Sequence, residues 1–275
     1  MVQIISWNVN GIRSINTKGK DGKKHTDNVS ESVLQSIIAT HNPDIICLQE
    51  IKCSLSNEKD FDMYRSDYKH IYMNCSSARK GYSGVAVLTK KPPLNVSYGF
   101  EKLTTAYTFD QEGRMLTLEY ENMFVICCYT PNSKPKLERL DERTNVWEPA
   151  FRKYVMLLQS TKPVVIVGDL NVAPTENDIH TTKGHARSAG FTKEERGAFA
   201  ELVKECDLVD AFRKLHPNER RYTYFSNFAK SRERNAGWRI DFTLVSKKLG
   251  NKVEKSEMLS DYYGSDHVPI LLTMK

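Results

Sequence analysis

The sequence predicts a mixed α/β (α+β) protein in which two mainly antiparallel β-sheets pack face to face and helices cover them. Short apolar runs bounded by polar turns recur along the chain, which is typical of strands. Two of these runs, 115–120 and 124–129, are separated by only a short turn and therefore predict an antiparallel hairpin. The helical segments are too few and too irregularly spaced for a barrel of alternating strands and helices.

The predicted strands, in chain order, are 3–7, 44–48, 84–88, 115–120, 124–129, 164–167, 240–245 and 270–272. Helices are predicted at 30–39, 137–159 and 193–206. Ser30 is expected to cap the first helix, and Asn42-Pro43 to end it. Thr192 and Glu195 resemble a capping box in front of the last helix.

The domain organisation expected from the sequence is one catalytic domain over residues 1–275. The chain is long enough for a large single core, and it contains no low-complexity linker and no short-period repeat. The segment 16–28 is polar, basic and glycine-containing, so it is predicted to be an exposed basic loop inserted into this domain.

The charge distribution suits a polyanionic partner. Lys and Arg number 40 against 34 Asp and Glu, which gives a formal charge of +6. The basic residues gather in the segments 18–24, 134–139 and 213–239, and this clustering favours a charged face.

The cysteine pattern and the chain start indicate an intracellular protein in a reducing compartment, in which nucleus, nucleoid and cytoplasm remain open. The six cysteines form no CxxC pair, so zinc and a disulfide framework are not expected. Neither a signal peptide nor an apolar run of membrane-spanning length is visible, so no membrane partner is expected.

Acidic and amide residues recur where predicted strands end. They are Asn8 and Asn10, Glu50, Asp169 and Asn171, Asp241, and Asp266 with His267 before the last strand. Each alone is typical of a turn or a helix cap. Together, oxygen donors with one histidine are what Mg²⁺ and a phosphate ester need. A serine-hydrolase elbow, a P-loop and a dinucleotide fingerprint are all missing from the sequence.

Motifs spread over almost the whole chain resemble the exonuclease III type of apurinic/apyrimidinic (AP) endonuclease, in the endonuclease/exonuclease/phosphatase superfamily. The matching segments are 6–13 (SWNVNGIR), 48–52 (LQEIK), 81–86 (GYSGVA), 129–133 (YTPNS), 168–173 (GDLNVA), 190–192 (GFT), 237–241 (GWRID) and 265–269 (SDHVP).

The resemblance implies a four-layer α/β sandwich, two packed sheets flanked by helices, with the active site at one edge. It also implies a monomeric DNA repair enzyme that acts on double-stranded DNA with Mg²⁺, for which Mn²⁺ substitutes. The expected reaction is hydrolysis of the phosphodiester 5′ to an abasic site, which leaves a 3′-hydroxyl and a 5′-deoxyribose phosphate. Side activities of this class are 3′-phosphodiesterase and 3′–5′ exonuclease.

The resemblance assigns roles to the residues at the strand ends. Glu50 is the expected principal metal ligand, with Asn8, Asn10 and Asp266 in or behind the coordination sphere. The expected catalytic residues are Asp169, which activates water, Asn171 and Tyr129, which donate to phosphate, and His267, whose ring Asp241 orients.

The resemblance also predicts the DNA contacts. A pocket for deoxyribose without its base needs bulky apolar walls, and Tyr224, Trp238 and Ile240 match those positions. Phe228 is a predicted wedge into the base stack. The residues expected to hold the DNA backbone are Arg13, Lys52, Tyr82 and Asn132.

The chain departs from the family pattern at four positions and in one segment. Asn10 stands where some members carry Asp, which bears on metal affinity. His185 and Ser188 stand where amides are common near the pocket, and Pro135 replaces an intercalating Arg of some relatives. The segment 16–28 adds a basic loop for which only nonspecific DNA contact is expected.

Three other functions use the same scaffold. A phosphatase or lipid phosphodiesterase would share the metal and His–Asp chemistry, but Trp238, Tyr224 and the basic segments argue against it. A catalytically inactive DNA-binding protein would not need the full set of candidate catalytic residues. A retroelement-type endonuclease is expected in a longer polyprotein, whereas this chain begins at the first predicted strand and stops after the last.

Overall fold

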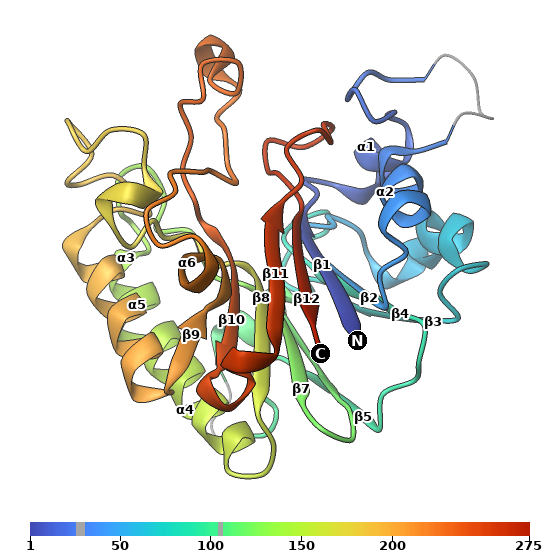
Figure 1. Ribbon diagram of the computed structural model, residues 1–275, viewed down its shortest axis with the longest axis horizontal. Helices are drawn as coiled ribbons and strands as arrows, with labels where there is room; N and C mark the ends of the chain where they lie inside the picture. The colour runs from blue at the N-terminus through green and yellow to red at the C-terminus, as the bar shows by residue number, and fades with distance from the viewer. Residues whose placement is uncertain (26–30, 104–106) are drawn as a thin grey trace.

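The computed structural model describes residues 1–25, 31–103 and 107–275, and it contains two six-stranded sheets packed face to face (Figure 1). The first sheet has the order β11 (Val253–Met258), β12 (Ile270–Met274), β1 (Val2–Asn8), β2 (Ile45–Gln49), β4 (Val85–Thr89), β3 (His70–Asn74). The second has the order β5 (Asn95–Tyr98), β6 (Met115–Glu119), β7 (Phe124–Tyr129), β8 (Val164–Asp169), β10 (Asp241–Ser246), β9 (Leu208–Asp210).

Strand direction brings the polar ends of both sheets together. Each sheet contains one parallel pair, β1 with β2 and β7 with β8, and its other neighbours are antiparallel. The carboxyl ends of these four strands therefore lie at one edge, where the antiparallel strands β10 and β12 begin. Asp169 is paired with Asp241 across β8 and β10, for example.

Helices cover the outer faces of the sheets and complete the four layers (Figure 1). The first sheet is covered by α1 (Ile12–Asn16), α2 (Val33–His41) and the 3₁₀ segment η1 (Leu55–Tyr64). The second is covered by α4 (Glu148–Gln159) and α5 (Lys193–Glu205). The remaining elements are α3 (Leu140–Glu142), the π-helical η3 (Arg143–Trp147), α6 (Ala211–Leu215), η2 (Thr108–Glu112), η4 (Glu176–Asp178), η5 (Phe228–Lys230) and η6 (Lys247–Lys252).

The alternation of side chains along each strand separates three apolar layers. In β7, Val125 and Cys127 point into the core between the sheets, whereas Ile126 and Cys128 pack under α4 and α5. A third core fills the space between the first sheet and α1, α2 and η1. The predicted four-layer sandwich with mainly antiparallel sheets is confirmed.

All eight predicted strands are present, but four further strands were not predicted. Of these, β3, β5 and β11 lie at sheet edges and carry half-exposed residues, so they lack a continuous apolar run. The fourth, β9, has only three residues. An edge strand needs apolar residues on one face at most, and this weakens its signal in the sequence.

Two of the three predicted helices start later than predicted, and the third starts at Lys193 as predicted. The first long helix begins at Val33 and is capped by Ser32, whose hydroxyl accepts a hydrogen bond from the Gln35 N–H. The predicted cap Ser30 lies outside the described residues. The predicted helix 137–159 begins at Leu140 and includes a π-helical turn, and the predicted capping box of Thr192 and Glu195 is confirmed.

In the described part of the basic segment, 16–25, residues 17–25 form a short hairpin. Lys18 and Lys24 form an antiparallel bridge, and the Gly19 N–H donates to the Lys23 carbonyl at 3.0 Å. Residues 26–28 of the predicted loop lie outside the described residues. Of the helices described, none combines the length and the apolar composition needed to cross a lipid bilayer.

Candidate active site

Three of the candidate residues lie just after strands in an unusual backbone conformation. Asn10, Glu50 and Asn171 have φ values of 48°, 50° and 51°, the left-handed region that non-glycine residues rarely adopt. Each of these residues lies within two positions of a strand end, so its polar side chain lies at the edge of the sandwich. This backbone conformation costs free energy, and such costs are concentrated at functional sites.

Asn8 joins the two sheets at this edge. Its amide nitrogen donates to Glu50 Oε1 at 3.1 Å, within its own sheet, and to Asp169 Oδ2 at 2.9 Å, across the sandwich. Tyr129 donates its hydroxyl proton to the same Glu50 oxygen at 2.7 Å. Burial raises the pKa of Tyr129 well above its ordinary value, so its hydroxyl remains a donor.

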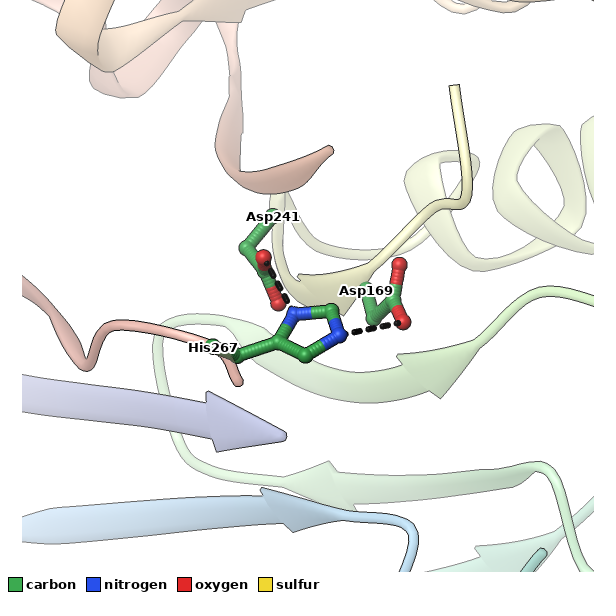
Figure 2. Close-up of side chains that lie close together, drawn as sticks. All are labelled: Asp169, Asp241 and His267. Carbon is green, nitrogen blue, oxygen red and sulfur yellow. Dashed lines mark hydrogen bonds and ion pairs between the residues drawn. The ribbon is translucent and has the colours of Figure 1, made fainter. Parts of the chain in front are cut away.

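Asp169, Asp241 and His267 lie close together in one cluster (Figure 2). His267 Nδ1 lies 2.8 Å from Asp241 Oδ2, and His267 Nε2 faces Asp169 Oδ2 at 3.9 Å. Burial disfavours the charged imidazole, but the two carboxylates outweigh burial and raise the pKa of His267 to about 10. Burial and the charge of Asp241 raise the pKa of Asp169 to about 7, against the opposite effect of His267.

These three side chains offer potential metal ligand atoms within 4.8 Å of one another. The neighbouring carboxylates raise the pKa of His267 and so favour the protonated imidazole, which carries a proton on each ring nitrogen and offers no lone pair to a metal. We therefore interpret this cluster as an aspartate-held cation beside a carboxylate of raised pKa, which is an arrangement for proton transfer and anion binding.

A second set of oxygen atoms surrounds a positive charge. The Lys52 ammonium lies 3.1 Å from Glu50 Oε2 and also contacts Asn10 Oδ1. Asn10 in turn donates to Asp266 Oδ1 at 3.0 Å. Burial raises the pKa of Glu50, but Tyr129 and Lys52 bring it below its ordinary value. This set of carboxylate and amide oxygens already accommodates a cation and fits a hard metal ion.

The cleft beside these groups has a volume of about 590 Å³ and one aromatic wall. Tyr224 lies with its ring centroid 5.0 Å from that of His267, and Trp238 and Ile240 continue the wall. The His185 ring meets Trp238 edge to face at 5.2 Å. The cleft is also lined by Pro135 and Ser188, two departures from the family pattern, and by the predicted wedge Phe228, which has 84% of its surface exposed.

The remaining predicted DNA-contact residues lie at varying distances from this cleft. Asn132 lines it and donates to Asn171 Oδ1 at 2.8 Å, while Asn171 donates to the Thr130 carbonyl. Arg13 is exposed and paired with Asp60 on η1. Tyr82 accepts a hydrogen bond from the buried Arg114 at 2.8 Å and does not line the cleft.

A buried ion pair that the sequence does not predict supports the site. Arg143 is fully buried and donates to the carbonyls of Leu170 and Asn171 at 2.8 Å and 2.7 Å, and to Glu195 at 2.9 Å. Glu195 also accepts from Ser133 Oγ and from the Gly190 N–H. The pair therefore ties together three loops that line the cleft. The capping box at Glu195 was visible in the sequence, but its partner Arg143 was not.

The family of this chain follows from its similarity to known proteins. A model of the endonuclease/exonuclease/phosphatase family matches residues 5–267, and the chain belongs to this family. Within it, the chain is an enzyme of the exodeoxyribonuclease and AP endonuclease type, a hydrolase and DNA repair nuclease.

Two curated relatives cover 98% of this chain. The exodeoxyribonuclease of Bacillus subtilis (strain 168) is 41% identical over 272 residues and is itself covered to 98%. The DNA repair nuclease APEX1 of Danio rerio is 38% identical over 273 residues and is covered to 81%.

Solved structures share the fold over the whole chain. The AP endonuclease of Leishmania major has a TM-score of 0.83 at 26% identity, with 87% of its chain covered. An AP endonuclease from Archaeoglobus fulgidus has a TM-score of 0.81 at 27% identity, with 100% covered.

Proposed function

We propose that this enzyme is a Mg²⁺-dependent endonuclease that hydrolyses the phosphodiester on the 5′ side of an abasic site in double-stranded DNA. The observation that carries the proposal is that one cleft contains both a candidate catalytic pair and an aromatic wall. The pair Asp169 and His267 can transfer a proton and bind an anion, and the wall of Tyr224, Trp238 and Ile240 suits a sugar without a base. The proposed products are a 3′-hydroxyl and a 5′-deoxyribose phosphate.

Glu50 is the proposed main ligand of the metal, with Asp266 and Asn10 beside it and Asn8 behind. Asn8 uses its amide protons on Glu50 and Asp169, and its oxygen accepts the Asn10 N–H at 3.1 Å, so it positions the carboxylates. When bound, Mg²⁺ neutralises charge that develops on the phosphate oxygens. Mn²⁺ is a proposed substitute because it accepts the same oxygen donors.

Asp169 is the proposed general base for the attacking water. Its carboxylate is oriented by Asn8 and by the Asn171 N–H at 2.8 Å, and its raised pKa makes it a proton acceptor near neutrality. The charged His267 stabilises the developing negative charge on phosphate, with Asp241 holding the ring. Asn171 and Tyr129 are the proposed further donors to phosphate oxygens.

The cleft provides the proposed selectivity for an abasic sugar. We propose that a deoxyribose ring lies against Trp238 and Ile240, and that an attached base would collide with this wall. Lys52, Arg13, Tyr82 and Asn132 are the proposed backbone contacts, and the exposed Phe228 is the proposed wedge. The same site would support 3′-phosphodiesterase and 3′–5′ exonuclease activity on strand ends, and the protein is proposed to act as a monomer.

Cleavage of a duplex with one tetrahydrofuran residue tests the proposal. Mg²⁺-dependent incision directly 5′ to this residue is expected, with far slower cleavage of the intact duplex. An inositol phosphate serves as the competing substrate for the related phosphatases. Preferential hydrolysis of the inositol phosphate, or equal cutting of both duplexes, would contradict the proposed function.

The variant Glu50→Gln is expected to raise the Mg²⁺ concentration needed for half-maximal incision by at least about tenfold, because it removes the charge of the main ligand. Direct binding of Mn²⁺, followed by electron paramagnetic resonance, should weaken in parallel. Glu121→Gln, at an exposed position on the opposite edge, is the matched control. Unchanged metal titrations for Glu50→Gln would remove Glu50 from the coordination sphere.

The incision rate is expected to have a bell-shaped pH dependence. Asp169 acts in its deprotonated form, so the rate rises with pH through its pKa, which bound Mg²⁺ brings below the metal-free value of about 7. His267 acts in its charged form, so the rate falls again through its pKa of about 10. The variant Asp241→Asn should move this alkaline limb to lower pH, because it removes the carboxylate that raises the His267 pKa. An NMR titration of the imidazole checks the assignment, and an unmoved limb would refute it.

A further inference from the structure

The hairpin at 17–25 is docked onto the turn that leads into the active site. The Tyr263 N–H donates to the Lys20 carbonyl at 2.9 Å, and Lys18 Nζ donates to the Gly264 carbonyl at 2.7 Å. The Lys20 ammonium lies 4.6 Å from the centroid of the Tyr262 ring. These contacts fix the hairpin directly before Ser265, Asp266 and His267.

Gly22 makes this docking possible. A Cβ atom at Gly22 would lie 2.8 Å from Tyr263 Cβ, and the φ of Gly22 is +77°, so a larger residue would be strained here and would push the hairpin away. The hairpin is therefore held against Tyr263 by close packing as well as by hydrogen bonds.

A second loop reaches the same turn from the other side. The Arg232 guanidinium lies 3.9 Å from the centroid of the Tyr263 ring, and it donates to the carbonyls of Ser260 and Tyr262. Arg232 belongs to the loop 226–236, which also carries Phe228 at the cleft. In Figure 1 this loop, the 259–266 turn and the hairpin all stand at the edge of the sandwich that holds the active site.

The resulting surface is basic and contains an exposed aromatic ring. Tyr263 is 44% exposed between the hairpin and Arg232. Lys20, Lys23 and Lys24 are exposed on the hairpin. The acidic side chains in 17–25 and 260–264 are Asp21, which lies 3.4 Å from Lys23, and Asp261, so positive charge is in excess. We call Lys20, Lys23, Lys24, Tyr263 and Arg232 the basic ridge.

We propose that the basic ridge binds the phosphate backbone of one double-stranded arm of the DNA, outside the stretch that the cleft holds. This inference rests on the proposed function. The lysines of the docked hairpin provide point charges that bind phosphates. Arg232 is held in place by stacking on Tyr263, and its guanidinium can also bind a phosphate. The ridge continues from the turn that carries Asp266 and His267, so an arm leaving the cleft on this side passes along it. Such contacts add affinity without reading base sequence.

Equilibrium binding of abasic duplexes without Mg²⁺ tests the ridge independently of catalysis. The variant Lys23→Ser/Lys24→Ser is compared with the wild type and with Lys247→Ser/Lys248→Ser, a charge-matched control on exposed positions of η6. Three substrates are needed: one with two long arms, and two in which one or the other arm is cut back to a few base pairs.

On the long duplex the ridge variant is expected to bind more weakly, with a salt dependence of log K reduced by about 1.8, since each lost phosphate contact contributes about 0.9. Its kcat should be unchanged, because the ridge does not touch the reacting groups. Shortening one particular arm should bring the wild type down to the level of the variant, whereas shortening the other arm should leave their difference intact. The control pair should behave as wild type throughout.

The variant Gly22→Ala keeps every lysine but disturbs the docking, and it should show the same dependence on one arm. Equal losses on both shortened duplexes, an unchanged salt slope, or wild-type binding by Gly22→Ala would overturn the proposal. If a single-stranded arm of equal length restored tight binding, the proposal would also be overturned. The ridge would then be a site for single-stranded DNA. Arm-dependent binding without incision would instead indicate failure of the proposed function alone.

Discussion

The variants Asp169→Asn and His267→Ala should each lower the single-turnover rate of abasic-site incision by about 10³-fold or more at saturating Mg²⁺. An amide in place of the Asp169 carboxylate could accept a hydrogen bond but could not take a proton from water. Loss of the imidazole removes the cation that Asp241 holds 2.8 Å away, and leaves that buried carboxylate without its partner. Both groups act mainly in the transition state, so binding of the abasic duplex should change much less than the rate.

Folding of both variants is checked by circular dichroism and by duplex binding, so that a misfolded protein is not mistaken for an inactive one. Asp141→Asn, an acid-to-amide change at an exposed position of α3, is the matched control and should retain full activity. Wild-type turnover by either active-site variant would exclude the assigned role. A loss that is restored by higher Mg²⁺ alone would place the residue in metal binding instead.

The variant Arg143→Met should lower the free energy of unfolding by about 3–5 kcal/mol, because it leaves the buried Glu195 without a counter-charge. The carbonyls of Leu170 and Asn171 would lose their donors at the same time. Because Asn171 then loses its support, incision should slow even below the denaturation temperature. Urea denaturation, together with the incision rate at a temperature where the variant is folded, measures both effects.

The surface ion pairs of Arg65 provide the comparison for this prediction. Arg65 pairs with Glu58 and Asp62 on η1, and their side chains are 59% and 63% exposed. Arg65→Met should therefore change the free energy of unfolding by less than about 1 kcal/mol. Equal small losses for Arg65→Met and Arg143→Met would show that the buried pair does not hold the three loops.

The central strands of both sheets were predictable from the sequence, whereas the edge strands and some helix starts were not. Strands such as β7 and β8 are buried on both faces, so they appear as continuous apolar runs. The edge strand β11 alternates Val253, Ser256 and Met258 with exposed polar residues, and this short, interrupted pattern was missed. Two helix starts were placed too early, at 30 and 137 instead of Val33 and Leu140, whereas the start at Lys193 was predicted correctly.

The candidate site was predictable where polar residues interrupt apolar runs. Asn8 and Asp169 end strands of the interior and Glu50 directly follows one, so each stands out in the sequence as a polar residue at the end of an apolar run. Arg143 and Arg114 gave no such signal, because a buried arginine in the sequence looks like any surface arginine. Their partners lie far along the chain, with Arg143 and Glu195 separated by 52 positions, and only the folded chain identifies them.

The amide of Asn8 spans the two sheets, and this has a mechanical consequence. Glu50, the proposed metal ligand, follows a strand of the first sheet, and Asp169, the proposed general base, ends a strand of the second. The distance between these two carboxylates therefore depends on how the two sheets pack against each other. Neither sheet alone carries both the proposed metal ligand and the proposed general base. A change in the apolar core between the sheets, even far from the cleft, would shift Glu50 relative to Asp169. Catalytic turnover therefore reports how well the two sheets are aligned.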